Sequence, residues 1–272
     1  MSNIFDSITL FIFDLDGVVY EGTNVIPGAL ELLQKLRDAG KIIYALTNNS
    51  TLTREMYKKK LDKIGIDIPL QKIMTSGFAT AQYLSEHGAI GKTAFVVGEI
   101  GLKMELQNVN ITPVNLHKSS KLPPSVDYVV VGLDRNFTYQ KISSALTYLL
   151  NGADFIASND DPNLPTDKGL QPGAGVMVSA ISTCSGKKPS ATIGKPNPIS
   201  ISEILKRENI SKESAVIIGD RFVTDISAGI NAGIKTIMVK TGAGKLEKDI
   251  ALNAEIKPHL IADSIADLLD LL

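Results

Sequence analysis

Acidic, basic and hydroxyl side chains follow four short apolar runs in this sequence, and their types could serve metal and phosphate chemistry. Carboxylate oxygens hold hard cations. A lysine and a hydroxyl can together bind the oxygens of a phosphoryl group. The four stretches are Asp14-Leu15-Asp16-Gly17, Thr47-Asn48-Asn49-Ser50, Lys195-Pro196-Asn197-Pro198, and Gly219-Asp220 with Asp225 five residues after Asp220.

Each stretch alone has an ordinary structural interpretation. An Asp-X-Asp pair is often a surface turn, and Thr47 with its two asparagines could cap the following helix. Gly219-Asp220 could be a strand-to-helix turn, and Lys195 could be a solvated lysine. The occurrence of all four in order, each after an apolar run, favours a shared site.

The apolar runs predict strands, and segments with helical spacing separate them. Strands are predicted at residues 9–13, 41–46, 93–97, 128–131, 154–157, 191–194, 215–218 and 236–239. Helices are predicted at residues 28–39, 53–64, 102–107, 139–150, 199–206 and 224–232, and loops near Pro123 and at residues 162–172. This alternation predicts an α/β fold with a doubly wound, Rossmann-like parallel sheet, in which sites form at the carboxyl ends of the strands.

The segment between the second and third stretches far exceeds the dozen or so residues that a plain crossover needs. Its own strand patterns predict an inserted smaller α/β domain. We expect the core to comprise residues 1–78 and 179–272 and the inserted domain to comprise residues 79–178.

Composition excludes several functional classes. The formal net charge is -1, so no excess of positive charge indicates nucleic acid or a membrane surface as a partner. The single cysteine, Cys184, excludes an intramolecular disulfide and a multi-cysteine zinc site. The N-terminus lacks a signal-peptide pattern and no apolar run could span a bilayer, so we expect a cytoplasmic protein. We interpret Lys58-Lys59-Lys60 as a solvated helix face.

In their order, the four stretches resemble the motifs of the haloacid dehalogenase superfamily of phosphohydrolases. Residues 130–139 and 159–175, together with 194–198, resemble its p-nitrophenylphosphatase-like subfamily, which includes phosphoglycolate, pyridoxal-phosphate and nucleotide or sugar-phosphate phosphatases. The resemblance covers nearly the whole chain. It implies a Mg²⁺-dependent phosphatase that hydrolyses small phosphomonoesters through an aspartyl-phosphate. Sugar, glycolate, glycerol and nucleotide phosphates are the candidate substrates, with p-nitrophenyl phosphate in vitro.

The resemblance also assigns the catalytic and substrate-binding roles. Asp14 would be the nucleophile, and Asp16 would protonate the leaving group and later deprotonate water. Thr47, Asn48 and Asn49 would bind the phosphoryl oxygens. Lys195 would place a fixed positive charge on the same oxygens.

The metal ligands follow from the same resemblance. Asp14 and Asp220 would hold Mg²⁺, with Asp220 as a direct ligand, and Asp16 would contribute its backbone carbonyl. Asp225 would either ligate the ion through water or orient Lys195. The inserted domain would be a cap that excludes water and contacts the leaving group. A mobile loop is expected at residues 17–25, and a homodimer formed through the cap is compatible with the resemblance.

Several other functions remain open at this point. A phosphomutase or phosphotransferase of the same superfamily would use the same motifs. A phospho-accepting signalling module would be about half as long, and a dehalogenase would lack Asp16. A non-catalytic sugar-phosphate-binding protein would be expected to have lost one of the two aspartates, and both are present.

Overall fold

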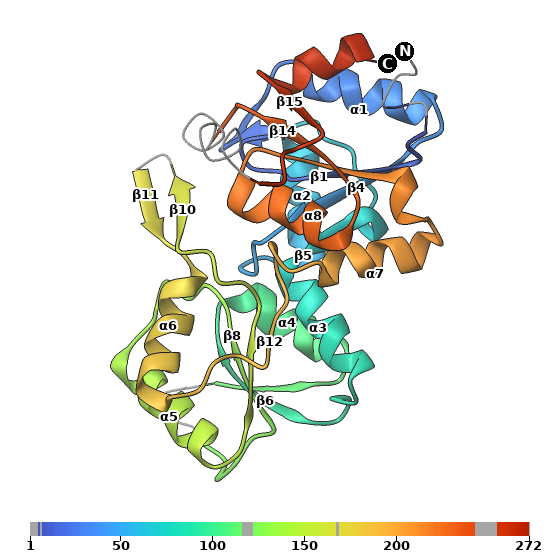
Figure 1. Ribbon diagram of the computed structural model, residues 1–272. Coiled ribbons are helices and arrows are strands. Elements are labelled where there is room, and N and C mark those ends of the chain that lie inside the picture. The colour runs from blue at the N-terminus through green and yellow to red at the C-terminus, as the bar shows by residue number, and fades with distance from the viewer. Residues whose placement is uncertain (1–4, 6, 116–121, 167–168, 243–254, 272) are drawn as a thin grey trace. The chain divides into compact units, whose positions relative to one another are not determined.

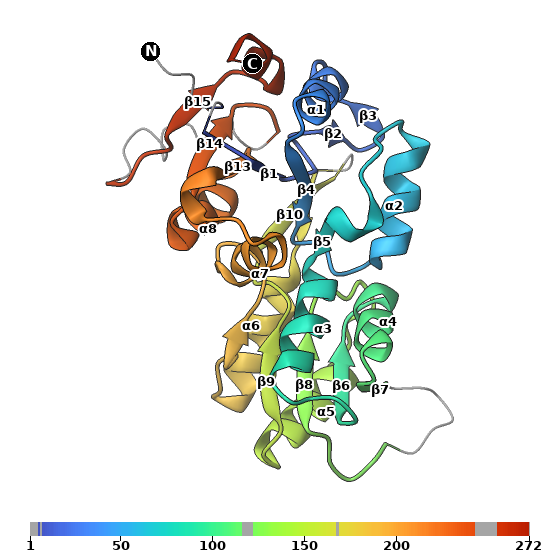
Figure 2. The same cartoon turned by 90° about the vertical axis from the view of Figure 1, so that its right-hand side faces the viewer.

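The chain forms two compact units in the structure, a computed structural model (Figures 1 and 2). It describes residues 5, 7–115, 122–166, 169–242 and 255–271. The first unit comprises Met1–Thr47, Lys58–Met74 and Lys195–Leu272, and the second comprises Asn48–Tyr57 and Thr75–Gly194. The predicted boundaries of the inserted domain, residues 79 and 178, fall inside the second unit.

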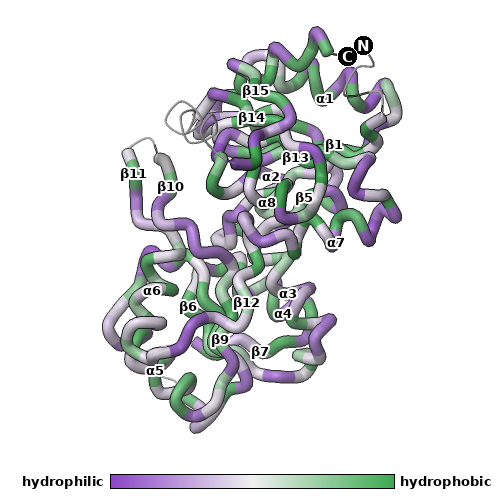
Figure 3. The backbone as a smooth tube through the Cα atoms, in the orientation of Figure 1, coloured by the Kyte–Doolittle hydropathy of each residue, from purple (hydrophilic) through white to green (hydrophobic). Residues whose placement is uncertain are grey.

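The first unit is built on a six-stranded sheet in the order β15-β14-β13-β1-β4-β5. Its pairs from β15 to β4 are parallel. The strands are β1 (Leu10–Phe13), β4 (Ile42–Thr47), β5 (Ile73–Thr75), β13 (Ala215–Gly219), β14 (Lys235–Val239) and β15 (Leu260–Ala262). β1 and β13 are buried along their whole length, as continuous apolar runs in a covered parallel sheet should be. Figure 3 colours both strands green, the colour of hydrophobic residues.

Helices flank this sheet and carry its crossovers. They are α1 (Ala29–Asp38), α2 (Arg54–Lys63), α7 (Ile199–Glu208) and α8 (Ser227–Ala232), with short 3₁₀ helices at Leu70–Lys72, Lys212–Ser214 and Ile265–Leu271. α1 buries the leucines that the helical spacing indicated, Leu32, Leu33 and Leu36. Thr53 caps α2 as predicted, because its hydroxyl accepts a hydrogen bond from the Met56 N–H at 3.2 Å.

Two segments of the first unit differ from the prediction. The loop expected at residues 17–25 contains a small antiparallel hairpin, β2 (Tyr20–Glu21) paired with β3 (Asn24–Val25). The helix predicted at residues 224–232 begins as one π-helical turn, Phe222–Ile226, before α8. The π turn contains Asp225, and such turns are frequent at functional sites.

The second unit has its own parallel sheet of five strands in the order β12-β9-β8-β6-β7. The strands are β6 (Thr93–Val97), β7 (Thr112–Val114), β8 (Tyr128–Val131), β9 (Asp154–Ala157) and β12 (Ala191–Thr192). Its helices are α3 (Ser76–Glu86), α4 (Ile100–Asn108), α5 (Tyr139–Leu150) and α6 (Ala174–Ser185). β8 and β9 pack their apolar faces with α5 and α6 in one hydrophobic cluster that includes Phe95 and Tyr148.

Three expectations for this unit were wrong or incomplete. The strand before Lys195 pairs with β9, so it belongs to the second unit's sheet and not to the core sheet. Residues 162–172, predicted as a loop, contain the antiparallel hairpin β10 (Asn163–Thr166) and β11 (Gly169–Pro172). The helix α3 was not predicted; Thr75 caps it by accepting from the Phe78 N–H at 3.1 Å.

Candidate active site

Asp14 lies at the centre of the first unit, directly after β1. Its N–H donates to the Ile218 carbonyl at 2.9 Å, which extends the pairing of β1 with β13 by one residue. The residue is buried, at 9% exposure. Burial raises the pKa of Asp14 above the ordinary aspartate value, and the Lys195 ammonium opposes that rise.

Lys195 joins three of the core segments through one buried ammonium group. Its Nζ lies 2.5 Å from Asp14 Oδ1 and 2.6 Å from Asp225 Oδ1, and it donates to the Leu46 carbonyl at 3.2 Å. Burial disfavours the ammonium charge, but the two carboxylates outweigh that effect and raise the pKa of Lys195. The lysine therefore carries a fixed positive charge beside Asp14.

Asp220 and Asp225 complete the acidic group at this edge of the sheet. Ligand oxygens of Asp14, Asp220 and Asp225 all lie within 4.8 Å of one another. The Arg221 N–H donates to Asp225 Oδ2 at 3.0 Å and fixes that carboxylate within the π turn. Asp220 is 2% exposed.

The surroundings of this cluster suit a hard divalent cation such as Mg²⁺. The donors are carboxylate oxygens, which Mg²⁺ prefers, and no cysteine or histidine belongs to the cluster of described residues. Gly17 has a φ of +85°, and a Cβ added there would lie 2.5 Å from Asp220 Oδ2. The backbone at Gly17 therefore approaches the carboxylate more closely than a residue with a side chain allows.

Asp16 lies apart from the three clustered carboxylates. Its side chain is exposed, and its backbone forms a bridge to Tyr20 at the base of the β2–β3 hairpin. Although the residue as a whole is exposed, the surrounding protein partly desolvates its carboxyl group and raises the pKa of Asp16, and the Lys60 ammonium partly offsets this rise. A raised pKa suits a carboxyl group that must hold a proton before it donates one.

Lys60 is a residue of this region that the sequence interpretation missed. The lysine run was interpreted as a solvated face, and for Lys60 that was wrong. Its Nζ donates to the Tyr20 hydroxyl at 3.0 Å, and partial burial lowers its pKa. Lys60 follows Tyr57 by three residues and directly precedes Leu61, and both of these residues are buried. Helical spacing therefore places Lys60 near the buried face of the helix, which is the signal that could have indicated its partial burial.

Thr47 ends β4 and is buried at 7% exposure. The chain first leaves the first unit between Thr47 and Asn48, and it enters that unit for the last time between Gly194 and Lys195. Two predicted site residues thus lie at segment ends of the first unit: Thr47 is the last residue of its first segment, and Lys195 is the first residue of its last segment.

Asn48 and Asn49 have well-defined partners inside the second unit. The Asn48 amide donates to both carboxylate oxygens of Asp161, at 3.0 and 3.1 Å, and its carbonyl accepts from Asn159 Nδ2 at 2.8 Å. Asn49 Oδ1 accepts from the Thr51 N–H at 2.7 Å, which is a local turn. The Asp161 contact was not predicted, because nothing local to either residue indicates it.

Comparison with known proteins identifies the family. A family model described as haloacid dehalogenase-like hydrolase matches residues 11–112, and a second, HAD-hydrolase-like, matches residues 192–268. An acid sugar phosphatase of Staphylococcus aureus is 38% identical over 237 residues, 87% of this chain and 88% of that protein.

Solved structures agree with this result over nearly the whole chain. A 4-nitrophenylphosphatase from Thermotoga maritima is 33% identical with a TM-score of 0.89, and 98% of each chain is covered. A hypothetical protein from Pyrococcus horikoshii is 41% identical with a TM-score of 0.86, covering 97% of this chain and 99% of that one.

The chain therefore belongs to the haloacid dehalogenase-like hydrolases. It is an enzyme, a phosphatase of that family, with the Rossmann-like core and inserted α/β domain that the sequence predicted. Enzymes of this family generally use a divalent metal. Within the described residues, no helix is both long and apolar enough to cross a membrane.

Proposed function

We propose that this phosphatase hydrolyses small phosphomonoesters by forming an aspartyl-phosphate on Asp14, with Mg²⁺ as its cofactor. The observation that carries this proposal is the position of Asp14 at the end of β1, within 2.5 Å of a buried lysine and within a cluster of three carboxylates. A surface Asp-X-Asp turn would have none of these neighbours.

In the first step, an Asp14 oxygen attacks phosphorus and the bond from phosphorus to the ester oxygen breaks. Asp16 gives its proton to the departing alkoxide oxygen. In the second step, Asp16 takes a proton from water, the water oxygen attacks phosphorus, and the bond to Asp14 breaks. Inorganic phosphate leaves, and both aspartates return to their starting state.

The remaining predicted residues bind and orient the phosphoryl group. The Lys195 ammonium neutralises its oxygens and keeps Asp14 ionised. The Thr47 hydroxyl donates to the same oxygens, with Asn48 and Asn49 next to it in the chain. Because Asp161 and Asn159 hold both the side chain and the carbonyl of Asn48, they restrict the backbone that follows Thr47.

Asp14, Asp220 and Asp225 would hold the Mg²⁺, with the Asp16 carbonyl as a further ligand. The ion is needed because Asp14 and a phosphate repel each other, by about 4 kcal/mol at ~4 Å and an effective dielectric constant near 20. When bound, it supplies positive charge that offsets this repulsion.

For the substrate, we propose a sugar phosphate or a similar small alkyl phosphate, because the Staphylococcus aureus protein that is 38% identical to this chain over 237 residues is an acid sugar phosphatase. p-Nitrophenyl phosphate should serve as a substrate in vitro, as the name of the Thermotoga maritima protein indicates for that enzyme. The second unit would act as the cap that contacts the leaving group.

The test is Asp14→Asn, assayed for phosphate release from a panel of sugar, glycolate, glycerol and nucleotide phosphates. An amide cannot form the acyl-phosphate, so turnover should vanish, and rapid-quench trapping should find no phosphorylated protein. Asp38→Asn, on the exposed side of α1, is the matched control and should be fully active. Chelation of divalent ions should stop the unmodified enzyme, and added Mg²⁺ should restore it.

Two outcomes would contradict the proposal. Activity above a trace in Asp14→Asn would exclude the covalent mechanism. Conversion of one phosphate ester into another without release of inorganic phosphate would indicate a phosphomutase or phosphotransferase.

A further inference from the structure

The sheet of the second unit has a topological switch point of its own. From β6 the chain crosses by α4 to β7 on one side, whereas β8, β9 and β12 extend the sheet in the other direction. The switch therefore falls between β6 and β8. In open parallel α/β sheets, ligands bind outside the carboxyl ends of the strands at such a point.

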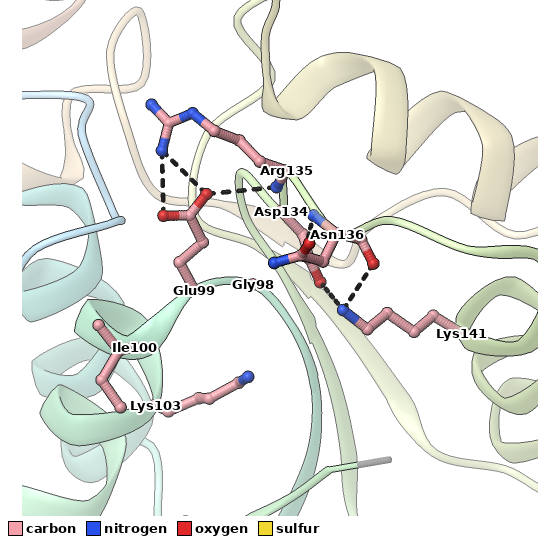
Figure 4. Close-up of a pocket in the computed structure, with 8 residues that line it drawn as sticks. All are labelled: Gly98, Glu99, Ile100, Lys103, Asp134, Arg135, Asn136 and Lys141. Carbon is pink, nitrogen blue, oxygen red and sulfur yellow. Dashed lines mark hydrogen bonds and ion pairs between the residues drawn. The ribbon is translucent and has the colours of Figure 1, made fainter. Parts of the chain in front are cut away.

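A pocket of about 390 Å³ lies at this place. Its walls come from the segment after β6, the segment after β8 and the first turn of α5, all within the second unit. The lining residues are Gly98, Glu99, Ile100, Lys103, Asp134, Arg135, Asn136 and Lys141 (Figure 4).

Both carboxylates of the pocket are already engaged by cations. Arg135 Nη1 lies 2.9 and 3.0 Å from the two Glu99 oxygens. Lys141 Nζ lies 2.6 Å from Asp134 Oδ2, and Asp134 is only 2% exposed. The pocket is lined by three cationic residues, Lys103, Arg135 and Lys141, and two of them, Arg135 and Lys141, neutralise its two carboxylates.

Lys103 is the third cation, and its charge is in excess. Among the described residues, its ammonium has no hydrogen-bond or ion-pair partner. Figure 4 shows that Lys103 and Lys141 extend into the pocket from α4 and α5, respectively. Partial burial lowers the pKa of Lys103, and the Lys141 charge lowers it further while Asp134 opposes this. A partly desolvated ammonium is stabilised when an anion binds beside it.

The N-terminus of α4 adds to this positive field. The helix has 9 residues, and it begins at Ile100, in the pocket wall. Its N-cap residue, Glu99, makes no side-chain capping bond, because its carboxylate is held by Arg135. The positive end of the helix dipole favours anions. In α4 the Gly101 N–H already donates to the Thr51 carbonyl at 3.0 Å, so the helix contributes through its dipole rather than through that group.

We propose that this pocket is a second ligand site of the protein, which binds the phosphate or carboxylate group of a small metabolite through Lys103 and the first turn of α4. All its residues belong to the second unit, whereas Asp14 and its cluster belong to the first. The proposal does not depend on the chemistry proposed for Asp14.

The test is amide-resolved NMR on the full-length ¹⁵N-labelled protein without divalent ions. Inorganic phosphate, succinate and sodium chloride are titrated separately at matched ionic strength. Phosphate or succinate should shift the amide signals of Gly98, Ile100 and Gly101 with saturation. The response to phosphate compared with succinate identifies which oxyanion the site takes.

The matched variants are Lys103→Met and Lys92→Met. Lys92 is exposed and lies directly before β6, whereas Lys103 lies in α4, the helix that follows β6. Loss of a charged hydrogen bond should weaken binding about tenfold or more in Lys103→Met. Lys92→Met should bind as the unmodified protein does, and Lys103→Arg should retain most of the affinity.

Three results would overturn the proposal. One is no saturable shift at Gly98–Gly101 with phosphate or succinate at tens of millimolar. Another is equal shifts with sodium chloride, which would mean simple screening. The third is an unchanged affinity in Lys103→Met. A well-dispersed spectrum of that variant verifies that its fold is retained. If the methionine variant does not fold, Lys103→Gln takes its place.

Discussion

Lys195 Nζ lies 2.5 Å from Asp14 Oδ1 and 2.6 Å from Asp225 Oδ1, so one buried ammonium neutralises two buried carboxylates. Removal of one partner from such a group leaves the others charged and desolvated, which costs about 3–5 kcal/mol. The same lysine is thus required for the stability of the metal-free core and, in the mechanism proposed, for binding of the phosphoryl group.

Lys195→Met should therefore lower the free energy of unfolding by about 3–5 kcal/mol in urea without divalent ions. Lys240→Met removes a lysine that pairs with the exposed Asp263, and it should cost less than about 1 kcal/mol. Asp14→Asn combined with Lys195→Met should recover part of the loss, because one buried charge is removed. Equal destabilisation by the two single lysine variants would contradict the structural role assigned to Lys195.

Asp16→Asn should separate substrates by their leaving groups. An alkoxide is very basic and needs a proton, so phospho-enzyme formation on an alkyl phosphate should slow about 10²–10⁴-fold. Nitrophenolate leaves readily without a proton, and the same step on p-nitrophenyl phosphate should slow much less. Because Asp16 is also the proposed base of the second step, the measurement must be single-turnover trapping of phosphorylated Asp14. Equal slowing for both substrates would remove Asp16 from the acid role.

In Lys60→Met, the rate of phospho-enzyme formation should begin to fall at a higher pH than in the unmodified enzyme. The Lys60 ammonium favours the ionised form of Asp16 and so lowers the pKa of that carboxyl group. Without this charge, the pKa of Asp16 rises further, and the protonated acid persists to higher pH. Single-turnover rates on an alkyl phosphate across pH would show this, with the exposed Lys59→Met as the control. A profile that does not move, or that moves to lower pH, would exclude the electrostatic coupling.

Glu208→Gln should destabilise the core at neutral pH but not in acid. Burial alone would raise the pKa of Glu208, but hydrogen bonds from Lys72 and Tyr44, both 2.6 Å long, outweigh it and lower the pKa. A lowered folded-state pKa contributes stability above the unfolded value of 4.5, and this contribution is lost as pH falls through the folded value.

Urea unfolding should accordingly show a loss of about 1–2 kcal/mol at pH 7 in Glu208→Gln that disappears near pH 3. Glu31→Gln, which breaks an exposed pair with Lys35, should change stability little at either pH. A loss in Glu208→Gln that is independent of pH would indicate a packing effect.

The fold and the family could be predicted from the sequence because both depend on local patterns. The apolar runs of β1 and β13 are short and rich in β-branched or aromatic residues, which favours buried strands in a covered sheet, and each run is followed by a polar motif. The order of the motifs along the chain then predicted one site for Asp14, Lys195 and Asp225, and these three side chains lie together in the structure.

The features that were missed depend on contacts between distant segments. Ala191–Thr192 is too short for its sequence to specify which sheet it joins, and hydrogen bonds to β9 decide this. The orientation of Lys60 depends on the position of Tyr20, and the environment of Asn48 depends on Asp161. Periodicity cannot report such pairs, because each is set by tertiary packing.

The order of strands in the core sheet also determines which strand pairs can form while the chain is being synthesised. Leu10 pairs with Ile42 on one side and with Ala215 on the other. A ribosome adds about 5–20 residues per second, so Asp14 and Thr47 emerge well before Lys195 and Asp220 exist. Every residue of the second unit is synthesised before Lys195. During translation, β1 therefore keeps one edge unpaired, and the nascent chain contains Asp14, the proposed nucleophile, without the lysine that neutralises it.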